Sequence, residues 1–353
     1  MDGRERLLGC IYRKPIDRVP MMEMYWEGIA DTWRGQGMPA TDKTPGEFFG
    51  MDQMNFAAID WSFQYPEEVV EETDEYTVKR SSENILVKTR KDSPLPEFSD
   101  FPVTGRDSWE AIKHRIEFNE KRIDIVKAKT DQAATENTHL QVYIEPCLGF
   151  EKYKYCMGTE GILNAIGEDP EWVLEMIEAT ERLAFDGLDY CLGCGMAFDI
   201  AYVTEDLGFA TGPFFSPAFY KNYMMPSHKR FCDYCRSKGM KVMLHSCGAI
   251  MKLMPMLVEA GFELLNPLEQ KAGMDLYTVK KEYGDRLVLW GGIDVKTISF
   301  GTDGQLRDEI RDKVTFAKQG GGYIFGSDHS IPLNVSYDRY LKMVEWGLEY
   351  GKY

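Results

Sequence analysis

A histidine and a cysteine two residues apart are the strongest candidates for metal-binding chemistry in this sequence. They are His245 and Cys247, in the stretch MLHSCG (243–248). Side chains two positions apart in an extended strand face the same side of a sheet, so both can reach one ion. Imidazole and thiolate suit Zn²⁺, and a catalytic zinc site has about three protein ligands plus an open position. We expect His329, near the end of another predicted strand, to be the third ligand. The alternative is a half-buried thiol beside a histidine that caps a strand.

Other cysteines offer competing ligands. Two Cys-x-x-Cys pairs, at 191–194 and 232–235, would together supply four thiolates. The second pair lies inside a predicted helix at 217–237, and no glycine turns of a zinc knuckle flank it. We therefore interpret these thiols as small apolar groups in the core and at a helix end. Cys147 and Cys156 flank a loop after a predicted strand and are substitute ligands for the His-x-Cys site.

Short apolar strands alternate with amphipathic helices over the C-terminal two thirds of the chain, which is typical of a parallel α/β fold. The predicted strands cover 18–23, 55–59, 139–146, 196–203, 241–246, 262–267, 286–292 and 321–327. A parallel sheet must be covered by helices, and a closed barrel has no edges. We therefore predict a (β/α)8 TIM-type barrel.

Residues 60–135 do not follow this alternation. The segments 69–78 and 85–90, with SSEN (81–84) between them, are typical of a β-hairpin, and the strongly charged segment 108–129 is typical of a helix. We predict one domain over 1–353, in which 60–135 forms an insertion or an N-terminal layer on the barrel.

The charge balance excludes several classes of function. Lys and Arg number 41 against 57 Asp and Glu, which gives a net charge of −16. Such a chain repels phosphate backbones and anionic membranes, so we expect no nucleic acid and no membrane among its partners. Charges interrupt every apolar stretch of the first 20 residues, so we predict no signal peptide there. Eight Cys in a chain of this length indicate reduced thiols and a cytoplasmic protein.

Catalytic groups of a TIM-type barrel lie at the C-terminal ends of its strands. The predicted strands end on or just before polar residues, namely Glu23, Glu145, Thr204, Glu205, Asp206, His245, Asn266, Asp294, Ser327, Asp328 and His329. A ring of apolar strands that each finish on a polar side chain predicts a lined pocket at this rim.

Several stretches of the chain resemble the uroporphyrinogen decarboxylase superfamily, and in particular its branch of cobamide- and corrinoid-dependent methyltransferases. The matching stretches are DRVP (17–20), 204–226, MLHSCG (243–248), 264–276, 283–294 and 320–332. They span about three quarters of the chain, in the same order as in the family. The resemblance implies a barrel with its pocket at the C-terminal rim.

Two departures from the family pattern bear on function. The decarboxylases carry an Arg-rich N-terminal motif that grips carboxylates, whereas VPMMEMY (19–25) has Glu23 and no Arg. The methyltransferase branch binds zinc through His-x-Cys plus a Cys near the end of the chain. The last position falls in 326–329, which contains no Cys, so His329 is the expected substitute, with Asp328 or Glu205 as further candidates.

The resemblance implies a zinc-dependent methyltransferase that moves a methyl group from a methoxy compound, possibly aromatic, to the Co(I) corrinoid of a partner protein. Glu205 or Asp206 would orient the substrate or supply a proton. The expected substrate-binding residues are Glu23, Tyr25, Trp26, Asn266, Asp294 and Phe325. The alternatives are methyl transfer from methylcorrinoid to a thiol or pterin, a porphyrinogen-type decarboxylase, and a binding barrel without catalysis.

Overall fold

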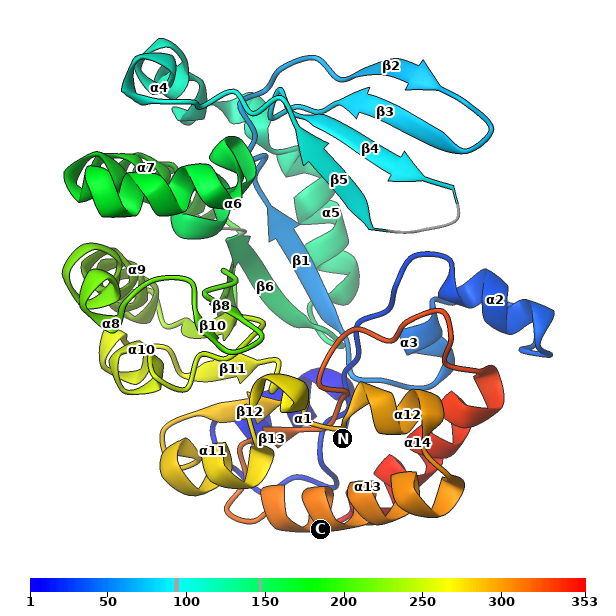
Figure 1. Cartoon of the computed structure of the whole chain (residues 1–353). Coiled ribbons are helices and arrows are strands. Elements are labelled where there is room, and N and C mark those ends of the chain that lie inside the picture. Colours follow the sequence, from blue (N-terminus) through cyan, green and yellow to red (C-terminus); the bar gives the residue numbers. More distant parts are fainter. Residues whose placement is uncertain (92–94, 146–147) are drawn as a thin grey trace.

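The centre of the molecule is a parallel sheet that curls around an apolar interior (Figure 1). The computed structural model describes residues 1–91, 95–145 and 148–353. The strands, in spatial order, are β1 (Met54–Ala58), β6 (Leu140–Glu145), β7 (Ile200–Thr204), β10 (Lys241–His245), β11 (Leu264–Asn266), β12 (Val288–Trp290) and β13 (Tyr323–Ile324). Neighbours pair in parallel, and they follow one another along the chain except where the N-terminal layer intervenes. The predicted α/β fold is confirmed.

The segment at 18–23 supplies the eighth side of the barrel. Met21 forms a parallel bridge with Phe325, and the backbone N–H of Met22 donates to the Phe325 carbonyl at 3.0 Å. On the other side, the N–H of Asp52 donates to the Met21 carbonyl at 2.8 Å, just before β1 begins. The segment therefore lies between β13 and the entry to β1, as the TIM-type prediction requires.

Helices cover the outside of the curled sheet and alternate with its strands (Figure 1). They are α6 (Phe150–Glu168), α7 (Pro170–Gly193), α8 (Pro217–Phe219), the π-helix η3 (Tyr220–Met224), α9 (Met225–Ser237), α10 (Met254–Ala260), η4 (Gln270–Ala272), α11 (Leu276–Tyr283), α12 (Val295–Phe300), α13 (Asp303–Ala317) and α14 (Tyr337–Tyr350). Asp169 caps α7 by accepting from Trp172 N–H, and Pro170 occupies the first turn. Among the residues that the structure describes, no helix is both long and apolar enough to cross a bilayer.

Alternate residues of each strand point into the barrel, as the period of two requires. Val142, Ile200, Met243 and Leu264 share one buried apolar cluster with inward-facing residues of β12 and β13. The helix α1 (Gly3–Ile11) adds Leu7, Cys10 and Ile11 to the same cluster. The N-terminal end of the barrel is therefore filled, and the C-terminal rim is left for a site.

The predicted hairpin of the N-terminal layer is confirmed, as part of a larger sheet. The strands β2 (Glu68–Glu72), β3 (Tyr76–Arg80), β4 (Leu86–Arg90) and β5 (Pro96–Ser99) form a four-stranded antiparallel sheet, in which β3 and β4 pair across residues 81–84. The first predicted arm, 69–78, is divided into β2 and β3 by a turn in which the N–H of Thr73 donates to the Tyr76 carbonyl at 2.9 Å. The fourth strand, β5, lies in a segment predicted as loop.

The predicted helix at 108–129 is wrong. This region contains α4 (Arg106–Ile112), the short helices η1 (Lys113–Ile116) and η2 (Glu120–Arg122), and α5 (Ile125–Thr135). The break has a physical cause. The buried Arg122 guanidinium donates to the carbonyls of Asp60 at 2.5 Å, Ser62 at 3.0 Å and Glu117 at 3.0 Å. A continuous helix over 108–129 would pair the Glu117 carbonyl with the N–H of residue 121 and would not leave it free to accept from Arg122. The grouping of 1–353 into one domain stays a prediction.

Further short helices, α2 (Ile29–Gly35) and α3 (Pro45–Phe48), follow the first barrel segment, and a two-stranded ribbon of β8 (Gly208–Phe209) and β9 (Gly212–Pro213) follows β7. This ribbon lies at the rim, because the N–H of Ala249 donates to the Phe209 carbonyl at 2.9 Å.

Candidate metal site and substrate pocket

Asp206, His245 and Cys247 meet at the C-terminal rim. One ligand atom from each lies within 4.8 Å of the others. The Cys247 Sγ is 3.6 Å from His245 Nε2, and Nε2 is 3.8 Å from Asp206 Oδ1. All three side chains are partly buried. The His-x-Cys pair therefore faces one side as predicted, and its neighbour is Asp206, to which the sequence had assigned a different role.

A hydrogen bond at Nδ1, the ring nitrogen that faces away from Cys247, fixes the orientation of the His245 ring. Its Nδ1 lies 2.8 Å from Asn266 Oδ1, which also accepts from the Tyr202 hydroxyl at 3.2 Å. Because an amide oxygen can only accept, Nδ1 carries the proton and Nε2 presents its lone pair to Asp206 and Cys247. Metal-binding histidines typically donate the N–H of their other ring nitrogen to a neighbouring acceptor in this way.

The Cys247 thiol is held in its protonated form. Burial is the main cause that raises its pKa, and the nearby carboxylates of Asp206 and Glu269 raise it further. The backbone N–H of Cys247 donates to Asp206 Oδ1 at 2.8 Å, which fixes the carboxylate beside the thiol. A bound cation would reverse the balance by favouring the thiolate.

Gly248 allows the loop after β10 to pack tightly. Its φ of +84° lies in the left-handed region, and a Cβ there would lie 2.3 Å from the backbone carbon of Gly208. Its N–H donates to Glu269 Oε2 at 2.6 Å. The glycine thus lets the β8 segment approach the residues that follow Cys247.

A cavity of about 110 Å³, which we call the metal-side cavity, opens beside the imidazole of His245 and the thiol of Cys247. Its lining residues are Glu23, Met24, His245, Cys247, Asn266, Pro267, Trp290, Ser327, His329 and Ser330. Glu23 Oε1 accepts from Ser327 Oγ at 2.7 Å and Oε2 accepts from Ser327 N–H at 2.9 Å. Burial raises the pKa of the Glu23 carboxyl to about 7, although these hydrogen bonds lower it in part. The cavity therefore holds an acid that can exchange a proton near neutral pH.

A second cavity, of about 340 Å³, adjoins the first and shares Glu23, Met24 and Trp290 with it. We call it the wall cavity, because it lies between the 22–25 segment and residues 51–56 at β1. Its other lining residues are Met22, Tyr25, Thr44, Gly46, Met51, Asp52, Gln53, Met54, Phe56 and Tyr202. Phe56, Tyr202 and Trp290 were not predicted as site residues. Tyr202 could have been found, since it lies two positions before the strand end and so faces inward.

The remaining predicted residues fall in different places. His329 lines the metal-side cavity, and its Nδ1 lies 3.4 Å from the Ser330 carbonyl. Tyr25 lines the wall cavity, and its hydroxyl lies 2.8 Å from that of Tyr340. Trp26 is partly buried, and its backbone N–H donates to the Ile331 carbonyl at 3.0 Å.

Asp294, Phe325 and Glu205 have structural contacts instead. Asp294 caps α12 by accepting from Lys296 N–H at 2.8 Å. Phe325 lies on the outer side of the barrel, where a Cβ on Gly347 of α14 would lie 2.8 Å from its ring. Glu205 is fully buried and accepts from His228 Nε2 at 2.9 Å.

The competing cysteines are consistent with the apolar interpretation. Cys156, Cys191, Cys232 and Cys235 are buried in the main core cluster. Burial raises the pKa of the Cys191 thiol to about 11. Cys147 lies outside the described residues.

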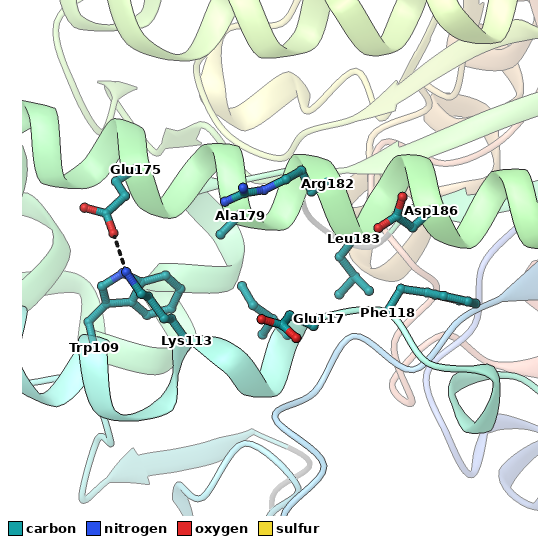
Figure 2. Close-up of a pocket in the computed structure, with 10 residues that line it drawn as sticks. Trp109, Lys113, Glu117, Phe118, Glu175, Ala179, Arg182, Leu183 and Asp186 are labelled. Atoms are coloured by element: carbon teal, nitrogen blue, oxygen red, sulfur yellow. Dashed lines mark hydrogen bonds and ion pairs between the residues drawn. The ribbon is translucent and has the colours of Figure 1, made fainter.

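A larger cavity, of about 570 Å³, lies away from the rim between η1 and α7 (Figure 2). Lys113 donates to Glu175 at 3.1 Å across it, and Arg182 and Asp186 line it from α7. The residues that line this cavity do not come from the strand ends of the barrel. Size alone therefore does not select it as the reactive site.

The fold and the rim cluster define a TIM-type barrel with a candidate metal site at the C-terminal ends of its strands. The family model described as Uroporphyrinogen decarboxylase (URO-D) matches residues 87–350, so the chain belongs to the uroporphyrinogen decarboxylase family. A solved structure described as a methyltransferase from Methanosarcina mazei has a similar fold, with a TM-score of 0.64, 14% identity and 99% of each chain covered.

A chitinase from Chromobacterium violaceum is more distant, with a TM-score of 0.41, 9% identity, and 94% of this chain and 99% of that chain covered. None of the curated proteins matches the sequence.

Proposed function

We propose that this chain is a zinc-dependent methyltransferase that moves a methyl group from a methoxy compound to the Co(I) corrinoid of a partner protein. The observation that carries the proposal is the group of Asp206, His245 and Cys247 at the rim of the barrel. The methyltransferase from Methanosarcina mazei, with the same fold, supports the type of group transferred.

The donor set fits zinc. One nitrogen, one sulfur and one oxygen ligand match the ligand types of catalytic zinc sites, which keep a further position open. His245 already presents the nitrogen that would bind the ion, because Asn266 occupies the other one. His329, in the same cavity, is a candidate for a further ligand. A bound zinc would supply Lewis-acid chemistry at the ether oxygen of the methyl donor.

A residue of this chain would supply the proton that the leaving oxygen takes up. Glu23 lies at the junction of the two cavities, and its pKa of about 7 allows it to hold a proton for the leaving oxygen. Ser327 and the backbone of Met24 fix the carboxyl through three hydrogen bonds. In this proposal Glu23 takes the role first assigned to Glu205, because Glu205 is occupied by His228.

The direction of transfer follows from the oxygen ligand. Methyl transfer to a thiol benefits from a sulfur-rich ligand set that donates charge, whereas a carboxylate gives a harder Lewis acid suited to an ether oxygen. Asp206 beside His245 therefore favours the methoxy donor over a thiol or pterin acceptor. A porphyrinogen-type decarboxylase needs cationic groups for its carboxylates, and the described residues that line the two cavities include neither Lys nor Arg.

The test begins with metal analysis. We expect about one zinc per chain in the purified protein and a loss of that zinc in Cys247→Ala. Cys194→Ala is the matched control, since Cys194 is a partly buried thiol at the end of α7. Full zinc retention in Cys247→Ala would refute the metal assignment.

The second step is a transfer assay. The protein is incubated with a Co(I) corrinoid protein and a panel of methoxy compounds, and separately with methylcorrinoid and thiols. We expect methylation of the corrinoid in the first assay. Transfer to thiols only would contradict the proposed direction.

A further inference from the structure

We propose that the wall cavity binds an uncharged aromatic group of the methyl donor and selects against donors that carry a carboxylate. This inference rests on the proposed function and names the substrate class. The wall cavity adjoins the cavity that His245 and Cys247 line, because Glu23, Met24 and Trp290 line both cavities. A ring bound in the wall cavity can therefore direct a substituent past these three residues toward His245 and Cys247.

The wall cavity exists because the barrel is loosely closed at one place. β1 stands at the end of the seven-stranded order and pairs only with β6 in that sheet. Toward the 18–23 segment, the links run through one residue, Asp52, whose N–H donates to the Met21 carbonyl and whose Oδ2 accepts from Met21 N–H and from Arg18, each at 2.9 Å. Phe56, whose ring lies beside that of Tyr202 of β7, is 47% exposed although it belongs to a barrel strand.

The chemistry of the lining suits a flat apolar ring. Four aromatic side chains and four thioethers line the wall cavity, namely Tyr25, Phe56, Tyr202, Trp290, Met22, Met24, Met51 and Met54. The ring centroids of Phe56 and Tyr202 lie 6.3 Å apart, and the two ring planes are tilted by 32°. Aromatic rings and polarizable sulfur both favour an aromatic ligand.

The size is also suitable. An apolar cavity of roughly 150 Å³ can hold benzene. The wall cavity, at about 340 Å³, therefore has room for a ring with substituents.

The charges oppose a carboxylate. Within the described residues, the linings of the two cavities contain the acids Glu23 and Asp52 and contain neither Lys nor Arg. Arg6 and Arg18 lie behind Asp52 and are engaged by it at 2.5 and 2.9 Å. A carboxylate on the ligand would lose water without gaining a cationic partner.

The experiment compares two probes of similar size, 4-methoxybenzyl alcohol and 4-methoxybenzoate. Binding to the full-length metal-free chain is measured by titration calorimetry. We expect the alcohol to bind at least about tenfold more tightly than the benzoate, which corresponds to about 1.4 kcal/mol. Equal or tighter binding of the benzoate, or no binding of either probe, would overturn the inference.

A charge variant tests the location. Phe56→Lys places a cation on the wall, and we expect it to tighten benzoate binding severalfold and to weaken or reverse the preference for the alcohol. Phe300→Lys is the matched control, since Phe300 is 80% exposed at the end of α12, and it should leave the preference unchanged. An identical response of the two variants would place binding elsewhere.

The outcome is separable from that of the proposed function. Selective binding of the alcohol without methyl transfer to Co(I) would sustain the wall cavity and refute the transfer. Methyl transfer from both probes at equal efficiency would sustain the transfer and refute the selectivity of the wall cavity.

Discussion

At the scale of single residues, Asn266 decides which nitrogen of His245 faces Asp206 and Cys247. Its side-chain oxygen lies 2.8 Å from Nδ1. Groups that hydrogen-bond to a metal-binding histidine change metal affinity by about 10–100-fold when removed. We therefore expect Asn266→Ala to lower zinc affinity by that factor, measured by competition with a chelator. Asn164→Ala, on the exposed face of α6, is the control and should bind zinc as the wild type does. Unchanged affinity in Asn266→Ala would show that the ring is oriented by other contacts.

Glu23 should give the stability of the metal-free protein a measurable pH dependence. Burial raises its pKa from 4.5 to about 7 in the folded state. Between these values the folded protein binds the proton and the unfolded chain does not, so the free energy of unfolding falls as pH rises through this window. Glu23→Gln does not titrate. Its stability relative to the wild type should therefore increase by up to about 3 kcal/mol from pH 4.5 to 7. Urea unfolding at several pH values measures this, and parallel curves for the two proteins would contradict it.

At the scale of elements, the turn after β10 depends on Gly248. Alanine there would adopt a left-handed φ and press its Cβ against the backbone of Gly208. We expect Gly248→Ala to destabilise the fold by about 1–3 kcal/mol and to displace Cys247 from the metal site. Gly212→Ala, where a Cβ meets nothing within 4 Å, serves as the control in thermal unfolding and metal analysis. Wild-type stability and zinc binding in Gly248→Ala would refute this role.

The alternation of strands and helices made the barrel predictable, because period-two strands and apolar helix faces are local signals. The same period predicted that His245 and Cys247 face one side, and the two do meet, although β10 ends at His245 and Cys247 lies in the loop after it. Other features depend on long-range contacts. Arg122 breaks the expected helix by donating to Asp60 and Ser62, which are some 60 residues earlier. Phe325 was predicted to line the pocket, but its neighbour Ile324 is the residue that joins the interior cluster. The predicted strand at 321–327 has three consecutive apolar residues, 323–325, and so gave no alternation from which the inward residue could be chosen.

The ligand set was only partly predictable for the same reason. His329 and Asp206 both follow strand ends, and the sequence does not state which of them lies closer to the His-x-Cys pair. The structure groups Asp206 with the pair because its carboxylate accepts the N–H of Cys247.

At the scale of the whole molecule, the cavities limit what the chain can retain by itself. The two cavities at the rim, of about 110 and 340 Å³, reach only the lower part of the range of roughly 300–1,000 Å³ for drug-sized ligands, and a corrinoid is larger than such ligands. We predict that the isolated chain, mixed with cobalamin and passed through gel filtration, elutes without corrinoid absorbance. Cobalamin that elutes with the chain would contradict the need for a partner protein that carries the cofactor.

The position of helix α1 affects how the chain folds while it is being synthesised. Its residues close the N-terminal end of the barrel, and the Cys10 thiol donates to the Tyr323 carbonyl at 3.2 Å, 313 positions later in the sequence. Ribosomes add about 5–20 residues per second, so this helix leaves the exit tunnel roughly 15–60 s before the strand that completes its seat. During that interval α1 can pack against β6, which is made earlier, but its contact with β13 is missing. The first helix to be made therefore completes its seat only when one of the last strands has been made, and a chaperone or a provisional contact would shelter the apolar surface left open until then.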